Sequence, residues 1–245
     1  MRLRKFYQQP CFQQHQHAFT QFGVIGKHLT VEQYFNLAVA QQYIPLSPGE
    51  LGCSMSHLAA LKDFLESDED IAIIFEDDVI AAKNFDLERF EQQLRKIKLN
   101  SHFFLSLGGI EQRLNNRVYG RFEALQLFDR NVLKVHPGSL DRLSGAYAYC
   151  LDREMAKTLI QYHKSIRVYD HWDGLYAMNS SIHFYATHIF DHPEIKDQKE
   201  TLSHIELERL SLNRDRKAIK PWYIKLKQSM LKRWLKYFYQ SYGSH

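Results

Sequence analysis

A run of five apolar residues, Ile71 to Phe75, leads directly into three acidic residues, Glu76, Asp77 and Asp78. The apolar run is continuous rather than alternating, which is typical of a strand buried on both faces of a sheet. Burying an ionised carboxylate without a partner is costly, and adjacent carboxylates repel one another. The sequence therefore predicts that this acidic triplet ends a buried strand, where it is either solvated or neutralised by a cation.

The rest of the chain alternates predicted strands with predicted helices. Further strands are expected at His102–Gly109, Val132–Val135, Gly145–Leu151 and Ser181–Phe190, and helices at Val31–Gln42, Cys53–Ser67, Phe85–Ile97 and Arg153–His163. Leu46–Gly52 reads as a Pro/Gly turn, Ser54 or Ser56 as the cap of the helix after it, and Asp152 as the cap of the last helix. This order favours an α/β fold with an open, mostly parallel sheet flanked by helices.

The position of the acidic triplet suggests a binding site. In open α/β sheets, ligands bind outside the carboxyl ends of the strands. Carboxylate oxygens with no Cys or His beside them in sequence suit a hard cation such as Mn²⁺ or Mg²⁺. Such an ion can hold the diphosphate of a nucleotide-sugar. The alternative is a solvated strand end at which Asp77 or Asp78 caps the next turn.

Composition predicts one folded domain with a basic tail. The 245 residues are 44% hydrophobic, which is enough for a core. Residues 213–245 carry nine Lys/Arg and one Asp, a net charge of +8, which leaves −4 for residues 1–212 because the whole chain is +4. We therefore expect a domain at 1–212 and a separate tail at 213–245.

Cysteine usage and hydropathy predict a cytoplasmic protein. The three cysteines are widely spaced, without a CxxC pair, and are expected to be reduced thiols rather than a disulfide framework or a zinc site. No apolar run approaches the roughly 20 residues that span a bilayer. The first residues carry positive charge but lack the apolar core of a signal peptide.

The tail contains a predicted amphipathic helix, Lys220–Tyr242. Its apolar residues recur at helical spacing, at Tyr223, Leu226, Met230, Trp234 and Tyr237. Lysines with Trp and Tyr suit a helix that lies on an anionic membrane surface. The alternative is a terminal helix docked on the sheet. Nucleic-acid binding is not expected, because the body is acidic and no recognition motif accompanies the tail.

The segment Pro48–Val79 resembles the signature of glycosyltransferase family 25, which includes bacterial lipooligosaccharide galactosyltransferases and, more distantly, collagen galactosyltransferases. Gly49–Cys53 matches the family's Gly-Glu-[Ile/Leu]-Gly-Cys motif, Ser56-His57 its Ser-His pair, and the acidic triplet its Glu-Asp-Asp motif. A fainter match continues to about residue 205, through "LSGAYAYCLDREMAKTLI" and "VYDHWDGLY".

The resemblance implies a GT-A-like fold and an inverting, metal-dependent transfer of a sugar. The donor is usually UDP-galactose, and the acceptor is the outer core of lipooligosaccharide or lipopolysaccharide. Together with the basic tail, the resemblance predicts a peripheral protein on the inner face of the cytoplasmic membrane, where the lipid-linked acceptor resides.

The resemblance also implies roles for the acidic triplet. Glu76 and Asp78 are the predicted ligands of Mn²⁺ (or Mg²⁺), and with Asp77 they are predicted to contact the donor. One of His188 and His192, near the last predicted strand, is expected to supply an imidazole ligand.

Further candidates lie on other segments. Asp170 and Asp173 are candidates for the general base that an inverting transfer needs near the acceptor hydroxyl. His57, predicted at a helix start, either contacts the donor phosphate or is a buried histidine holding the turn before it. Gly108 and Gly109 either let the donor sugar approach the strand end or make a turn.

The start of the chain departs from the family pattern. Family members begin with an apolar strand followed by an Arg-rich turn; here Arg2, Arg4 and Lys5 match that turn, which leaves no room for the strand before it. This departure keeps open a second hypothesis, a non-catalytic or truncated relative that binds glycan or a partner at the membrane surface. A third, an Asp-dependent phosphotransfer protein, would need Ser/Thr and Lys at later strand ends, and the sequence offers no clear set.

Overall fold

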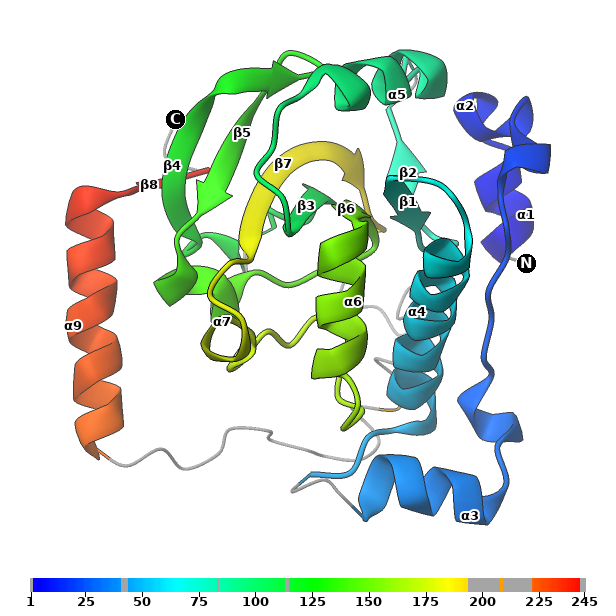
Figure 1. Ribbon diagram of the computed structural model, residues 1–245, viewed down its shortest axis with the longest axis horizontal. Coiled ribbons are helices and arrows are strands. Elements are labelled where there is room, and N and C mark those ends of the chain that lie inside the picture. The colour runs from blue at the N-terminus through cyan, green and yellow to red at the C-terminus, as the bar shows by residue number, and fades with distance from the viewer. Residues whose placement is uncertain are drawn as a thin grey trace.

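The computed structural model describes residues 2–40, 44–82, 84–112, 115–193, 208 and 222–242. Within these residues eight strands form one open sheet, in the order β1-β6-β3-β7-β5-β4-β8 with β2 paired to β7 (Figure 1). The strands are β1 (Ile71–Phe75), β2 (Ile80–Ala81), β3 (Phe103–Gly108), β4 (Tyr119–Leu127), β5 (Arg130–Val135), β6 (Ala148–Asp152), β7 (His183–Asp191) and β8 (Gln240–Ser241).

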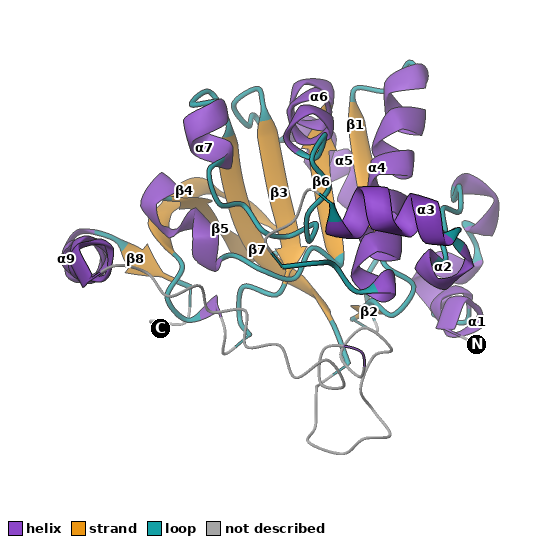
Figure 2. Cartoon of the chain, turned by 90° about the horizontal axis from the view of Figure 1, so that it is seen from below, coloured by secondary structure: helices purple, strands orange, loops and turns teal. Residues whose placement is uncertain are grey.

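Helices cover both faces of the sheet. One face carries α4 (Pro48–Glu66), α6 (Arg153–Tyr162), α7 (Leu175–Met178) and the 3-10 helix η5 (Pro137–Arg142); the other carries α1 (Arg2–Tyr7), α2 (Pro10–Gln13) and α5 (Leu87–Lys96). The N-terminal segment continues through η1 (Gln16–Ala18), η2 (Gly26–His28), α3 (Val31–Tyr34) and a π-helical turn, η3 (Phe35–Val39). Helix α9 (Trp222–Phe238) lies beside β8, at the opposite end of the molecule from α1 (Figure 2).

The sheet is mostly antiparallel, so the prediction of a mostly parallel sheet is wrong. Among the described strands only β3 and β7 pair in parallel, and β6 runs antiparallel to both of its neighbours, β1 and β3. A continuous apolar run indicates that a strand is buried on both faces, and here the helices on either side of the sheet bury it. Such a run does not indicate whether neighbouring strands are parallel or antiparallel. Because β1 and β3 both oppose β6, the strands β1, β3 and β7 point the same way and their carboxyl ends meet at one edge.

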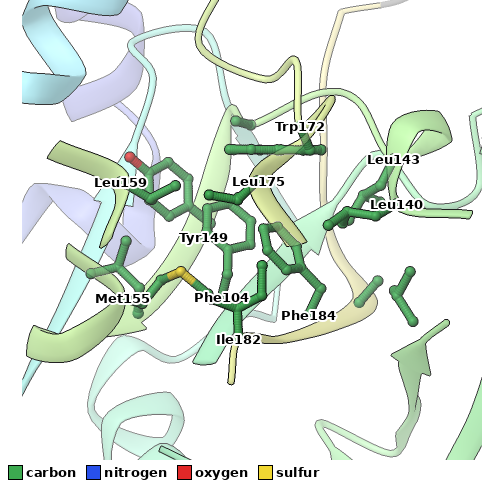
Figure 3. Packing of buried hydrophobic residues seen from close by; sticks show 14 of the residues in the cluster. Phe104, Leu140, Leu143, Tyr149, Met155, Leu159, Trp172, Leu175, Ile182 and Phe184 are labelled. Atoms are coloured by element: carbon green, nitrogen blue, oxygen red, sulfur yellow. The ribbon is translucent and has the colours of Figure 1, made fainter. Parts of the chain in front are cut away.

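Two hydrophobic cores hold this platform. Alternate residues of the central strands point to opposite faces. Phe104 and Tyr149 therefore pack in the cluster that includes α4 and α6 (Figure 3), whereas Leu105 and Cys150 pack in the cluster that includes α5. The rings of Phe104 and Tyr149 stack with centroids 4.6 Å apart. Each large side chain buried here stabilises the fold by roughly 1.5–3 kcal/mol, which makes the centre of the sheet a rigid support for its edge.

Helix α4 begins at Pro48, so the predicted turn at Leu46–Gly52 and the predicted caps Ser54 and Ser56 are wrong. The Ser47 hydroxyl accepts a hydrogen bond from the Glu50 N–H (3.2 Å), and the Glu50 carboxylate accepts one from the Ser47 N–H (2.8 Å). This capping box satisfies two otherwise unpaired donors, and a proline at the first helical position costs no hydrogen bond.

The other predicted elements differ mainly in extent. The cap at Asp152 is confirmed, because its side chain accepts from the Met155 N–H at 2.8 Å. Strand β4 was not predicted; a tight turn with positive φ at Phe128 and Asp129 joins it to β5. The expected boundary between residues 212 and 213 lies outside the described residues. No described helix is both long and apolar enough to cross a membrane.

Candidate functional site

The acidic triplet lies at the edge where β1, β3 and β7 end. It follows β1 directly, Gly108 closes β3, and His192 follows β7. The Glu76 N–H donates to the Tyr147 carbonyl at 2.7 Å, which extends the β1–β6 ladder by one residue and fixes where the triplet begins. Three segments far apart in sequence therefore meet at this edge of the sheet.

Asp78 is the buried member of the triplet, with 9% of its side chain exposed. Its Oδ2 lies 3.0 Å from Nη1 of Arg2 and 3.3 Å from Nε2 of His192. Its Oδ1 is buried and has no hydrogen-bond partner among the described residues. A buried carboxylate oxygen without a partner, beside an imidazole, fits a bound cation.

The charges around Asp78 keep it ionised. Burial raises the pKa of Asp78, but the hydrogen bond and charge of His192 and the charge of Arg2 outweigh burial, so the pKa is lowered. Burial lowers the pKa of His192, yet Asp78 raises it above its ordinary value. Asp77 differs, because burial and then the neighbouring Asp78 charge raise its pKa while Arg2, 3.9 Å away, opposes them.

Glu76 turns toward α4 rather than toward Asp78. Its Oε1 lies 3.3 Å from Nε2 of His57, and Nδ1 of His57 is hydrogen-bonded to the Tyr149 hydroxyl at 2.9 Å. The Tyr149 hydroxyl also meets that of Tyr169 at 2.7 Å, and the His57 ring stacks on Tyr169 with centroids 4.0 Å apart. Tyr149 and Tyr169 are buried, which raises the pKa of both hydroxyls, so both stay protonated.

His57 does not lie at a helix start, which corrects the expectation that the helix N-terminus would help it contact phosphate. Helix α4 begins at Pro48, so His57 lies in the third turn and only 5% of its side chain is exposed. Its contacts are to Glu76 and Tyr149 rather than to the residues before the helix. The histidine orients the first member of the acidic triplet.

Cys53 joins this group and was not among the sequence candidates. Ligand atoms of Cys53, His57 and Glu76 all lie within 4.8 Å of one another. The available signal was the spacing of four residues between Cys53 and His57, which places both on one face of a helix. These three residues therefore form a set that could hold a metal ion.

Gly108 leaves room for the ring of Tyr147. A Cβ on Gly108 would lie 2.5 Å from the Tyr147 ring, so only glycine lets this ring cross the end of β3. The Tyr147 hydroxyl donates to the Phe190 carbonyl at 3.1 Å, and its ring lies 5.1 Å from that of His192. Gly109 has φ +80°, in the left-handed region that favours glycine. The glycine pair thus shapes the edge through Tyr147.

His188 and His192 lie in different surroundings. Nε2 of His188 is 3.1 Å from Oδ1 of Asp191 and 3.5 Å from Oε2 of Glu111. His192 is the histidine beside Asp78, so of the two it is the one placed to share a cation with the triplet.

Comparison with known families gives these contacts a context. A family profile described as "Glycosyltransferase family 25 (LPS biosynthesis protein)" matches residues 2–175. The chain belongs to glycosyltransferase family 25. No curated protein is similar enough to the chain to count as a match. Membership indicates a glycosyltransferase of lipopolysaccharide biosynthesis, which moves a sugar from a donor to an oligosaccharide acceptor.

The two general-base candidates of this glycosyltransferase have different environments. Oδ2 of Asp170 accepts a hydrogen bond from the Gly145 N–H at 2.9 Å. The side-chain amide of Asn115 donates to the carbonyl of Ser144, which precedes Gly145, at 3.0 Å and to the carbonyl of Gly109 at 2.7 Å. These contacts connect Asp170 to the end of β3. Asp173 is exposed, and its backbone carbonyl accepts from the Tyr162 hydroxyl at 2.7 Å.

Proposed function

We propose that this family 25 glycosyltransferase transfers a sugar, galactose from UDP-galactose as the first candidate, to an outer-core acceptor of lipooligosaccharide or lipopolysaccharide, with inversion at the anomeric carbon. The observation that carries the proposal is Asp78, buried and ionised at the shared strand edge, with one oxygen unpartnered and His192 at 3.3 Å. Such an arrangement suits a diphosphate-bearing donor bound with a cation.

Asp78 and His192 are the proposed ligands of Mn²⁺ or Mg²⁺, and Glu76 and Asp77 are retained as donor-binding residues. A divalent ion held there would supply positive charge to neutralise a diphosphate leaving group. Arg2 contributes a positively charged side chain to the same site, with its Nη1 3.0 Å from Oδ2 of Asp78. Its guanidinium can hydrogen-bond to both a carboxylate and a phosphate.

Asp170 is the preferred general base, with Asp173 as the second candidate. Its bond to Gly145 N–H holds one carboxylate oxygen, which leaves the other to accept a proton from the acceptor hydroxyl. In an inverting transfer that hydroxyl oxygen bonds to the anomeric carbon as the bond to the diphosphate oxygen breaks on the opposite face. The diphosphate leaves with the electron pair.

We also propose that α9 holds the enzyme against the anionic inner face of the cytoplasmic membrane. Its exposed residues include Trp222 and Tyr237, with 75% and 86% of their surface accessible, together with Tyr223, Leu226, Met230 and Phe238. Lys227, Arg233 and Lys236 are exposed on the same helix, and Lys232 is partly exposed. Aromatic and basic side chains in one exposed helix favour an interface with anionic lipid.

The donor proposal is tested by calorimetric titration of UDP-galactose with and without Mn²⁺. We expect binding that requires the metal and that Asp78→Asn weakens at least tenfold, about 1.4 kcal/mol. Asp68→Asn, an exposed aspartate before the opposite end of β1, is the matched control and should bind like the wild type.

Three results would count against the proposal or part of it. If Asp78→Asn binds UDP-galactose as tightly as the wild type, Asp78 is not a ligand of the cation. Absence of binding by both UDP-galactose and UDP would argue against a UDP-sugar donor. Metal-dependent binding without transfer or donor hydrolysis would favour the non-catalytic alternative.

A further inference from the structure

We propose that Cys53, His57 and Glu76 form a second metal site, which binds a borderline-soft divalent ion with Zn²⁺ as the first candidate. This site is distinct from the hard-cation site proposed at Asp78, and it does not depend on the identity of the donor. It uses one thiol, one imidazole and one carboxylate whose ligand atoms lie within 4.8 Å of one another.

The distance between His57 and Glu76 fits two ligands of one ion. In a tetrahedral zinc site the metal–nitrogen and metal–oxygen bonds are about 2.0–2.2 Å, which sets the nitrogen–oxygen separation at about 3.3–3.5 Å. Nε2 of His57 lies 3.3 Å from Oε1 of Glu76. A direct N–H···O hydrogen bond is typically shorter, about 2.9–3.0 Å.

The imidazole is held in the orientation that a metal ligand needs. Nδ1 of His57 is bound to the Tyr149 hydroxyl, which is bound in turn to the Tyr169 hydroxyl, and the ring lies flat on Tyr169. If His57 donates its Nδ1 proton to the Tyr149 hydroxyl, the lone pair of Nε2 faces Glu76. Two lone pairs directed at one point repel each other unless a cation lies between them, and such an outer hydrogen bond is usual for metal-binding histidines.

The ligand types select the metal. Thiolate and imidazole favour zinc-like ions, whereas Mn²⁺ and Mg²⁺ prefer oxygen ligands. Three protein ligands leave one position for water or another ligand. Cys53 is half-buried, which gives an ion a route to the buried His57.

The site would couple helix α4 to the end of β1. Cys53 and His57 come from α4, and Glu76 is the first residue after β1, so a bound ion would link these two elements through all three side chains. Glu76 would then be a metal ligand turned away from Asp78. In this arrangement its part in donor binding is that of a positioning residue for the rest of the triplet.

Cobalt titration of the full chain, after removal of metals with a chelator, tests the site. We expect one equivalent of Co²⁺ per chain to produce a near-ultraviolet thiolate-to-cobalt charge-transfer band, and Zn²⁺ to displace it. Cys53→Ser should abolish the band, and Glu76→Gln should weaken cobalt affinity at least tenfold while the sulfur band remains. Cys11→Ser, at the other half-buried thiol, should leave band and affinity unchanged.

Absence of the band in the wild type would overturn the proposal, as would a band that survives in Cys53→Ser or is lost in Cys11→Ser. Circular dichroism of each variant shows whether it has folded. If Cys53→Ser does not fold, the test rests on Glu76→Gln, at a more exposed residue, and an unchanged affinity of that variant for Co²⁺ overturns the proposal. Asp78→Asn should keep the cobalt band. Loss of metal-dependent donor binding with the band intact would therefore separate the two sites.

Discussion

Burial of His163, a single ionisable residue, makes the stability of this fold depend on pH. The side chain follows α6 and is only 2% exposed, with its ring 5.1 Å from that of Tyr169. Burial, followed by the positive charge of Arg167, lowers the pKa of His163 to about 3. An unfolded histidine titrates near 6.5, so between those values the unfolded state binds the extra proton.

We therefore expect His163 to weaken the fold as the pH falls from about 6.5 toward 3, by up to about 1.4 kcal/mol per pH unit. His163→Phe keeps an aromatic ring over Tyr169 and removes the titration, so its stability should change less with pH over this range. Urea denaturation at pH 7 and pH 4.5 measures the difference. His17→Phe, at an exposed histidine, is the control, and equal slopes for His163→Phe and wild type would contradict the expectation.

Individual site residues were predictable where the signal was local. The apolar run before the acidic triplet placed Asp78 at a strand end, whereas a position near the last predicted strand did not distinguish His192 from His188. Arg2 carries no such signal, because its contact with Asp78 joins positions 76 residues apart in sequence. Cys53 was missed because the three cysteines were interpreted as reduced thiols and not as metal ligands, although the predicted helix already placed Cys53 one turn before His57.

Helix α4 and the N-terminal segment pack through two glycines. A Cβ on Gly52 would lie 2.5 Å from the Val24 carbonyl oxygen and 2.8 Å from the Gly26 nitrogen, and these are backbone atoms that cannot rotate aside. Gly52→Ala should therefore destabilise the protein by about 1–3 kcal/mol, although alanine is the better helix former by about 1 kcal/mol.

Urea denaturation of Gly52→Ala and Gly23→Ala checks this argument. No described atom outside its neighbours lies within 4 Å of a Cβ on Gly23, so that control should be neutral or slightly stabilising. Wild-type stability in Gly52→Ala would show that the N-terminal segment does not rest on α4 in this way.

Strands were predictable where a continuous apolar run marked a buried segment. Strands β1, β3, β6 and β7 follow their apolar runs closely. Strand β4 was missed because its polar and exposed positions resemble a loop, and its turn uses Phe128 and Asp129 instead of the Asn-Gly pair that usually signals a hairpin. The direction of β6 was missed because pairing partners distant in sequence decide it.

The whole molecule carries its charge unevenly. Residues 1–212 have a net charge of −4 and residues 213–245 of +8. Helix α9 stands at one end of the molecule, and β8 connects it to the sheet edge (Figure 1). The charge of Arg117, then burial, then the charges of Arg142 and Lys236 lower the pKa of Lys232, so positive charge from the body lies close to that of the helix. This distribution of charge is the reason we propose that the α9 end of the enzyme faces an anionic surface.

Vesicle co-sedimentation tests whether α9 uses this charge. The chain should bind vesicles containing phosphatidylglycerol and not pure phosphatidylcholine, and binding should weaken as salt is raised. Reversing Lys232, Arg233 and Lys236 to Glu should reduce binding at least a hundredfold, because each basic residue near such a surface contributes about 1 kcal/mol. The matched control reverses Lys62, Lys96 and Lys164, exposed on the body, and should bind like the wild type. Equal binding to both kinds of vesicle, or an α9 variant that binds as well as the control, would mean that the helix contacts something other than anionic lipid.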